Sequence, residues 1–117
     1  MNVFLKTFDS LNITGKMLTL LSNNNSVITN NISNSDTPGY VKQNTNFEQV
    51  MGSIRSPIET PLAKRMGPNP MLVEDGGKVV LEEEITNMQR NFLLYNLVTR
   101  RAGSLVTTIK SMAQVGR

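Results

Sequence analysis

The chain has 117 residues, of which 38% are hydrophobic and 5% aromatic, and it contains neither cysteine nor histidine. Disulfides, thiolate nucleophiles, imidazole bases and the usual zinc and copper ligands are therefore excluded. The formal net charge of +3 comes from 12 basic and 9 acidic residues that are interspersed, so no dense basic surface for nucleic acid is expected. We expect no enzyme, no cofactor and no metal site.

The N-terminal arm, residues 1–35, is predicted to form a helix because apolar residues recur in it every seven positions. Its many asparagines lower the helix propensity, so the arm should be only marginally helical when alone. Its longest apolar run, residues 3–5, is much shorter than a signal-peptide core or a membrane span, so we expect neither. The apolar stripe consists of Phe4, Leu11, Leu18, Leu21, Ile28 and Ile32.

A turn is predicted over residues 31–40, where the sequence reads NISNSDTPGY. Pro38 disfavours helical geometry at the residue before it, and Gly39 accepts a positive φ without steric cost. The side chains of Asp36 and Thr37 can bond nearby backbone amides. The chemistry of this segment by itself predicts an ordinary helix end and turn.

Residues 36–80 are predicted to form an irregular insert, because all five prolines lie between positions 38 and 70. Within this insert, Phe47 and Met51 are four positions apart, which matches one turn of an amphipathic helix. Residues 71–73 and 79–80 are apolar and flank an acidic, glycine-containing segment. This pattern predicts a short β-hairpin that leads into the C-terminal helix.

The C-terminal arm, residues 81–117, has the most regular apolar pattern of the chain. Steps of four and three residues run along nearly the whole arm, which predicts a helix on the order of 50 Å long. Residues 94, 98, 105 and 112 add apolar side chains beside this pattern, so the helix should contact two or more partners. The predicted packing seam comprises Leu81, Ile85, Met88, Phe92, Tyr95, Ala102, Val106 and Ile109.

These patterns together predict a mainly α protein with one structural domain. Its two long terminal helices should pair as a coiled-coil-like hairpin, with the irregular Pro-rich insert between them. Periodicity alone does not distinguish a self-contained hairpin from helices that pack against other chains.

The string over residues 31–40 resembles the N-terminal signature of flagellar axial proteins, the rod and hook family, which reads Asn-Ile-Ala-Asn-x-x-Thr-Pro-Gly-Tyr. Residues 46–48, 75–79, 81–84 and 94–95 are similar to segments of proximal rod proteins. Ser33 and Gly77 depart from the usual alanine and asparagine of that family. The residues that carry the signature are Asn31, Ile32, Asn34, Asp36, Thr37, Pro38, Gly39 and Tyr40.

The resemblance implies a structural subunit of the proximal rod, in the periplasmic part of the flagellar basal body. It implies export through the flagellar type III system without a cleaved signal peptide, and self-assembly in the service of motility. The implied partners are further copies, other rod proteins, the basal-body membrane ring with its adaptor, and the export gate. Phe47 and Met51 resemble the ends of a short segment by which early flagellar substrates dock on that gate.

Two alternatives remain open at this point. The first is another axial subunit of the proximal rod, because the family shares both helices and the turn. The second is a basic helical module that binds nucleic acid or a protein, which the isoelectric point of 9.5 and the Arg100–Arg101 pair would suit. We favour the first class and expect no nucleic acid, because the basic residues do not gather into a stripe.

Overall fold

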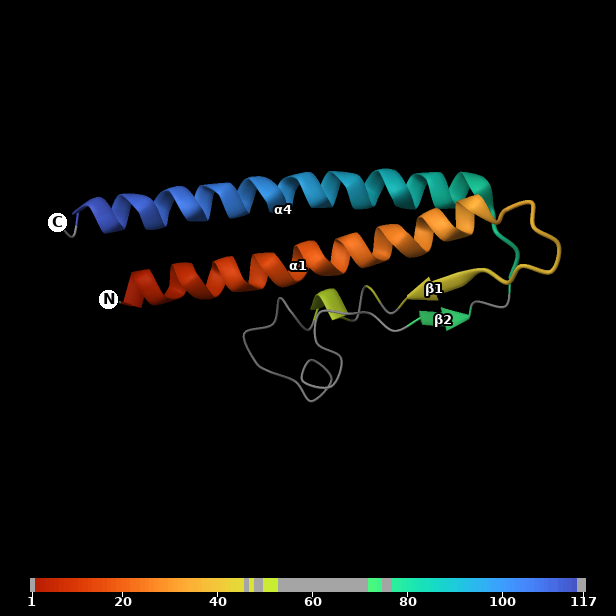
Figure 1. Ribbon diagram of the computed structural model, residues 1–117, viewed down its shortest axis with the longest axis horizontal. Coiled ribbons are helices and arrows are strands. Elements are labelled where there is room, and N and C mark those ends of the chain that lie inside the picture. The colour runs from red at the N-terminus through yellow and green to blue at the C-terminus, as the bar shows by residue number, and fades with distance from the viewer. Residues whose placement is uncertain (1, 46, 48–49, 53–71, 75–76, 116–117) are drawn as a thin grey trace.

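The computed structural model describes residues 2–45, 47, 50–52, 72–74 and 77–115. Helix α1 spans Asn2–Ser33 and helix α4 spans Leu81–Val115. Two short strands lie between them in sequence, β1 at Gln43–Thr45 and β2 at Leu72–Glu74. Figure 1 shows the two helices running antiparallel along each other, with both chain ends at one end of the hairpin. The prediction of a mainly α fold with two paired terminal helices is therefore confirmed.

Helix α1 ends in a series of tight turns. The amide of Asn34 donates to the carbonyl of Asn30 at 3.1 Å, and the amide of Ser35 donates to Ile32 at 3.2 Å. Two more turns follow, closed by the amides of Thr37 and Tyr40. Gly39 has a φ of 77°, a left-handed conformation that other residues adopt only with strain. These turns reverse the chain and direct it toward β1.

Helix α4 begins where the carbonyl of Val80 accepts a hydrogen bond from the amide of Glu84, at 3.1 Å. Its first turn carries three glutamates, residues 82–84, whose negative charges are favourable beside the exposed amides of a helix N-terminus. The start of this helix at Leu81 agrees with the sequence pattern.

The two strands form one antiparallel pair, in which Gln43 faces Glu74 and Thr45 faces Leu72. The sequence predicted a hairpin between residues 71–73 and 79–80, and that pairing is wrong. Residues 79–80 lie directly before α4, and the Val80 carbonyl is already used by the first helical hydrogen bond. The strand at Leu72–Glu74 therefore pairs with β1, and the amide of Lys42 extends the contact by donating to the carbonyl of Gly77 at 3.2 Å.

The core is small and lies where the short segment at residues 50–52 packs against the middle of the hairpin. Among the described residues, Leu20 and Leu21 of α1 are fully buried together with Val50 and Met51. The partly buried side chains that pack against this core cluster are Met17, Phe47, Leu94 and Val98.

The rest of the helix–helix interface contains many polar side chains. On α1, buried residues recur at sevens as Thr7, Thr14, Leu21 and Ile28, with Asn31 completing the face. On α4, the buried residues are Glu84, Asn91 and Leu105. An interface of this composition buries little apolar surface, so the hairpin should gain only modest stability from the hydrophobic effect.

The predicted packing seam of α4 does not form the contact with α1. Leu81, Ile85, Met88, Phe92, Tyr95 and Val106 are exposed, whereas Ala102 and Ile109 are half-buried. The residues that turn toward α1 mostly precede the seam residues by one position, as Asn91 precedes Phe92, which corresponds to about 100° of rotation around the helix. The face of α4 that contacts α1 instead carries Glu84 and Asn91 together with Leu94, Val98 and Leu105, so the seam stays a prediction about contacts with other chains.

The molecule is elongated, with extents of 63 × 29 × 14 Å. Within the described ranges, no helix combines the length and apolarity that a membrane span requires.

The core predicts a clear contrast between two leucines. Leu20 is completely buried. The substitution Leu20→Ala should lower the free energy of unfolding by about 3 kcal/mol, because it leaves a cavity among Leu21, Val50 and Met51. Leu93→Ala is the control, because that side chain is 64% exposed, and it should change stability by no more than about 0.5 kcal/mol. Denaturant unfolding followed by circular dichroism measures both, and equal effects would contradict the described core.

Candidate assembly site

The side chain of Asn31 binds the chain that follows the turn. Its Oδ1 accepts hydrogen bonds from the amide of Gln43 at 3.0 Å and from the hydroxyl of Tyr40 at 2.8 Å, and its Nδ2 donates to the carbonyl of Gln43 at 2.7 Å. One amide therefore satisfies both backbone groups of Gln43. Asn31 is only 2% exposed, so these bonds replace those that the amide and the backbone would make with water. This arrangement ties the last turn of α1 to the first residue of β1.

The same amide reaches the first turn of α4. Nδ2 of Asn31 lies 3.5 Å from Oε2 of Glu84, and Oε1 of Glu84 lies 3.3 Å from Nζ of Lys42. Glu84 is 1% exposed, and Oε1 accepts no hydrogen bond from the described residues, so its contact with the ammonium of Lys42 is an ion pair. Removing one partner of a buried ion pair leaves the other charge uncompensated, so loss of either Lys42 or Glu84 should destabilise the fold. We call Asn31, Tyr40, Lys42, Gln43 and Glu84 the turn clamp.

The turn clamp explains two of the signature residues, and local bonds explain others. Nδ2 of Asn34 donates to the carbonyl of Asn30 at 2.8 Å, and its Oδ1 accepts from the hydroxyl of Thr37 at 3.1 Å. Ile32 is half-buried, whereas Asp36, Pro38 and Gly39 are exposed. The structure thus brings Asn31 and Tyr40 together, while the residues between them shape the turn.

Sequence reasoning predicted the helix end but not the turn clamp. Lys42 and Gln43 carried no signal in the sequence. Lys42 looks like any surface lysine, and Gln43 contributes only its backbone groups. For Glu84 the sequence indicated only that residues 81–84 are similar to a segment of proximal rod proteins. Asn31 offered a signal in hindsight, because it follows Ile28 on the face that α1 buries, and a buried amide needs hydrogen-bond partners.

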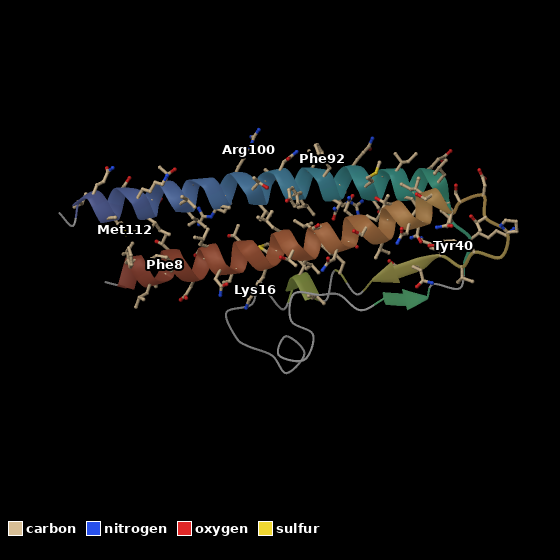
Figure 2. The ribbon with its side chains drawn as sticks, viewed as in Figure 1. Phe8, Lys16, Tyr40, Phe92, Arg100 and Met112 are labelled. Carbon is tan, nitrogen blue, oxygen red and sulfur yellow. The ribbon has the colours of Figure 1, made fainter. Side chains whose placement is uncertain are left out.

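The exposed part of the predicted seam forms an apolar strip along the first half of α4, from Leu81 to Tyr95, and continues at Val106 beyond the polar Thr99. Phe92 is 65% exposed, and Figure 2 shows it on the side of α4 away from α1. Apolar patches of this length are uncommon on isolated soluble proteins and mark interaction surfaces. We call this surface the outer stripe, which comprises Leu81, Ile85, Met88, Phe92, Tyr95 and Val106.

The residues proposed to contact the export gate lie partly in the core. Met51 is 9% exposed and Phe47 is partly buried, and both pack with Leu20 and Leu21. The described residues of this segment, 47 and 50–52, are helical, in line with the amphipathic-turn interpretation. Docking on another protein through both side chains therefore requires a chain in which this core is not yet formed.

The described residues contain no group of three or more acidic side chains placed to hold a metal ion. Their chemistry is that of packing and hydrogen bonding.

The sequence model of the flagella basal body rod protein family matches residues 17–40. The match covers the second half of α1 and the turn up to Tyr40, and it therefore includes two members of the turn clamp. It supports a flagellar rod protein, which confirms the family resemblance found in the sequence. The family is a structural one and belongs to the flagellum. No curated protein sequence and no solved structure matches the chain.

The turn clamp predicts that Asn31 and its neighbour Asn30 respond differently to the same change. Asn31→Asp removes the donor to Gln43 and sets a second carboxylate beside Glu84, so it should lower the free energy of unfolding by about 2 to 4 kcal/mol. Asn30→Asp adds the same charge one residue away at an exposed position and should change it by no more than about 0.5 kcal/mol. Thermal or denaturant unfolding of both variants gives the comparison. A tolerant Asn31→Asp variant would show that the amide does not hold the turn.

Proposed function

We propose that this chain is a structural subunit of the proximal rod of the flagellar basal body, of the FlgB type, which assembles by helix packing into the tubular drive shaft. The observation that carries the proposal is the rod-family match over residues 17–40, because it falls on the helix end and turn that the structure shows to be clamped. The fold suits this role, since an elongated hairpin with a 35-residue helix can lie along a tube.

The outer stripe supplies a surface for neighbouring subunits. The hairpin leaves these side chains exposed, and it buries few apolar residues of its own. Packing the outer stripe against a neighbour would bury apolar area that the isolated hairpin cannot, so assembly would stabilise both the contact and the fold. The proposed neighbours are further copies and other rod proteins, with the membrane ring and its adaptor at the base of the rod. Another axial subunit of the proximal rod is the nearest alternative.

The proposal includes export through the flagellar type III system to the periplasm. The small core described above is compatible with export of the chain before it folds. The segment from Phe47 to Met51 would then be available for docking on the export gate before the core forms.

Register is the property of α4 that assembly should depend on. One alanine inserted between Phe92 and Leu93 rotates everything beyond it by about 100°, which moves Leu105 out of the contact with α1 and Val106 out of the outer stripe. Rod assembly and swimming should fail. The same insertion between Met66 and Gly67 lies in the Pro-rich insert, where the direct cost should be only a few tenths of a kcal/mol, and swimming should survive.

Both insertions are compared in one strain, with rod completion, swimming and protein level scored together so that degradation is recognised. Equal tolerance at the two sites would contradict the model of a subunit that packs through α4.

Export is tested by two substitutions in the same short segment. Phe47→Ala removes the aromatic residue of the proposed docking segment and should reduce secretion of the chain while its cytoplasmic level is maintained. Val50→Ala is the matched control, because Val50 is 1% exposed in the same core but is not one of the two proposed docking residues. Secretion of the two variants is measured in the culture medium or periplasm. Equal secretion would return Phe47 to a purely structural role.

A further inference from the structure

Helix α4 has two faces that differ in composition and are rotated by about 100° from each other. The outer stripe is exposed and mainly apolar, with Thr99 interrupting it between Tyr95 and Val106. The inner face, which contacts α1, carries Glu84 and Asn91 beside apolar residues such as Leu94, Val98 and Leu105. Because both faces carry apolar side chains, the hydrophobic effect alone does not single out either of them. Another interaction must therefore select the face that is buried.

The inner face is marked by a second polar layer, distinct from the turn clamp. Nδ2 of Asn24 donates to Oδ1 of Asn91 at 3.2 Å, and Nδ2 of Asn91 donates to the backbone carbonyl of Leu21 at 3.0 Å. Asn91 is 5% exposed, so its amide has exchanged water for partners on α1. These bonds join residues 67 and 70 positions apart in the chain, and they exist only while this face of α4 meets α1.

The two polar layers match in spacing on both helices. Asn24 and Asn31 are one heptad apart on α1, and Glu84 and Asn91 are one heptad apart on α4. In an antiparallel pair this spacing places Asn24 with Asn91 in the same register that places Asn31 with Glu84. Both contacts are present in the structure.

A rotation of α4 that brought the outer stripe to α1 would break this match. Asn24 would then meet the side of α4 that carries Phe92, whose ring offers neither a donor nor an acceptor of comparable strength. The hydrogen bonds that Asn91 makes with Asn24 and with the carbonyl of Leu21 would be lost in that arrangement. The polar layer thus favours the observed face.

We propose that Asn24 and Asn91 determine which face of α4 pairs with α1. The same device is known in general terms from coiled coils, where a single buried asparagine selects one pairing at some cost in stability. Here it selects between two faces of one helix. The inference concerns pairing within the chain, and it stands whether or not the chain is a rod subunit.

The chain contains no cysteine, so introduced cysteine pairs report on the pairing without interference. Met17→Cys combined with Val98→Cys reports the observed face, because both side chains pack on one core cluster. Met17→Cys combined with Thr99→Cys reports the rotated face, because Thr99 is exposed and lies one residue further along α4, on the side of the outer stripe. Intramolecular disulfide yields are measured by non-reducing electrophoresis and mass spectrometry on dilute full-length protein.

In the parent background the 17/98 pair should oxidise much more than the 17/99 pair. With Asn24→Leu and Asn91→Leu added, the ratio of the two yields should fall by about tenfold, equivalent to about 1.4 kcal/mol. Asn25→Leu with Asn96→Leu is the matched control, because both asparagines are exposed on the same two helices, and the ratio should not change.

An unchanged ratio in a helical Asn24→Leu, Asn91→Leu protein would overturn the proposal. Loss of helicity in that variant, measured by circular dichroism, would also overturn it. The asparagines would then be needed for the helices to pair at all, and not for the choice of face. If the double variant aggregates, Asn91→Leu alone is measured in the same way, and the same two outcomes decide.

Discussion

A buried amide must find hydrogen-bond partners, and the side chain of Asn31 is the place where this requirement organises the chain. Its three short hydrogen bonds join the end of α1, the turn and the start of β1. Its contact with Glu84 adds the start of α4, and Lys42 compensates the charge that is buried there. The elements of the fold that are distant in sequence therefore meet at one residue. Without it, the end of α1 would lose its direct side-chain links to the first strand and to the start of α4.

The hairpin that the turn clamp closes has a small apolar core. Among the described residues, its core cluster consists of a few residues around Leu20 and Leu21, while an apolar surface on α4 is exposed. Because this apolar surface is exposed in the isolated chain, burying it against a neighbour would add stability that folding of the hairpin alone does not provide. This distribution is compatible with the rod subunit that we propose, which would bury the exposed surface against its neighbours.

The sequence predicted those features that depend on local chemistry. Proline and glycine predicted the end of α1 before the turn, and the apolar period predicted the start of α4 at Leu81. Periodicity, however, gives the repeat of a helix face and not its partner. The face with Phe92 was therefore assigned to packing, whereas α1 contacts the neighbouring face, where Asn91 makes hydrogen bonds that no local pattern reveals.

The strand at Leu72–Glu74 illustrates the same limit, since its partner β1 lies almost thirty residues earlier in the chain. Pairing at that distance depends on where the turn clamp places Gln43. The clamp itself joins residues 12 and 53 positions apart, and none of these separations produces a signal in a single sequence.

The most direct test of the central claim is a cross-sectional density map of purified flagellar basal bodies in which this chain is traced. The account predicts antiparallel α1 and α4 along the tube axis of the proximal rod, with the turn clamp formed and Phe92 buried against a neighbouring subunit. A map in which the chain is absent from the rod would contradict the account. So would a rod in which the outer stripe faces solvent.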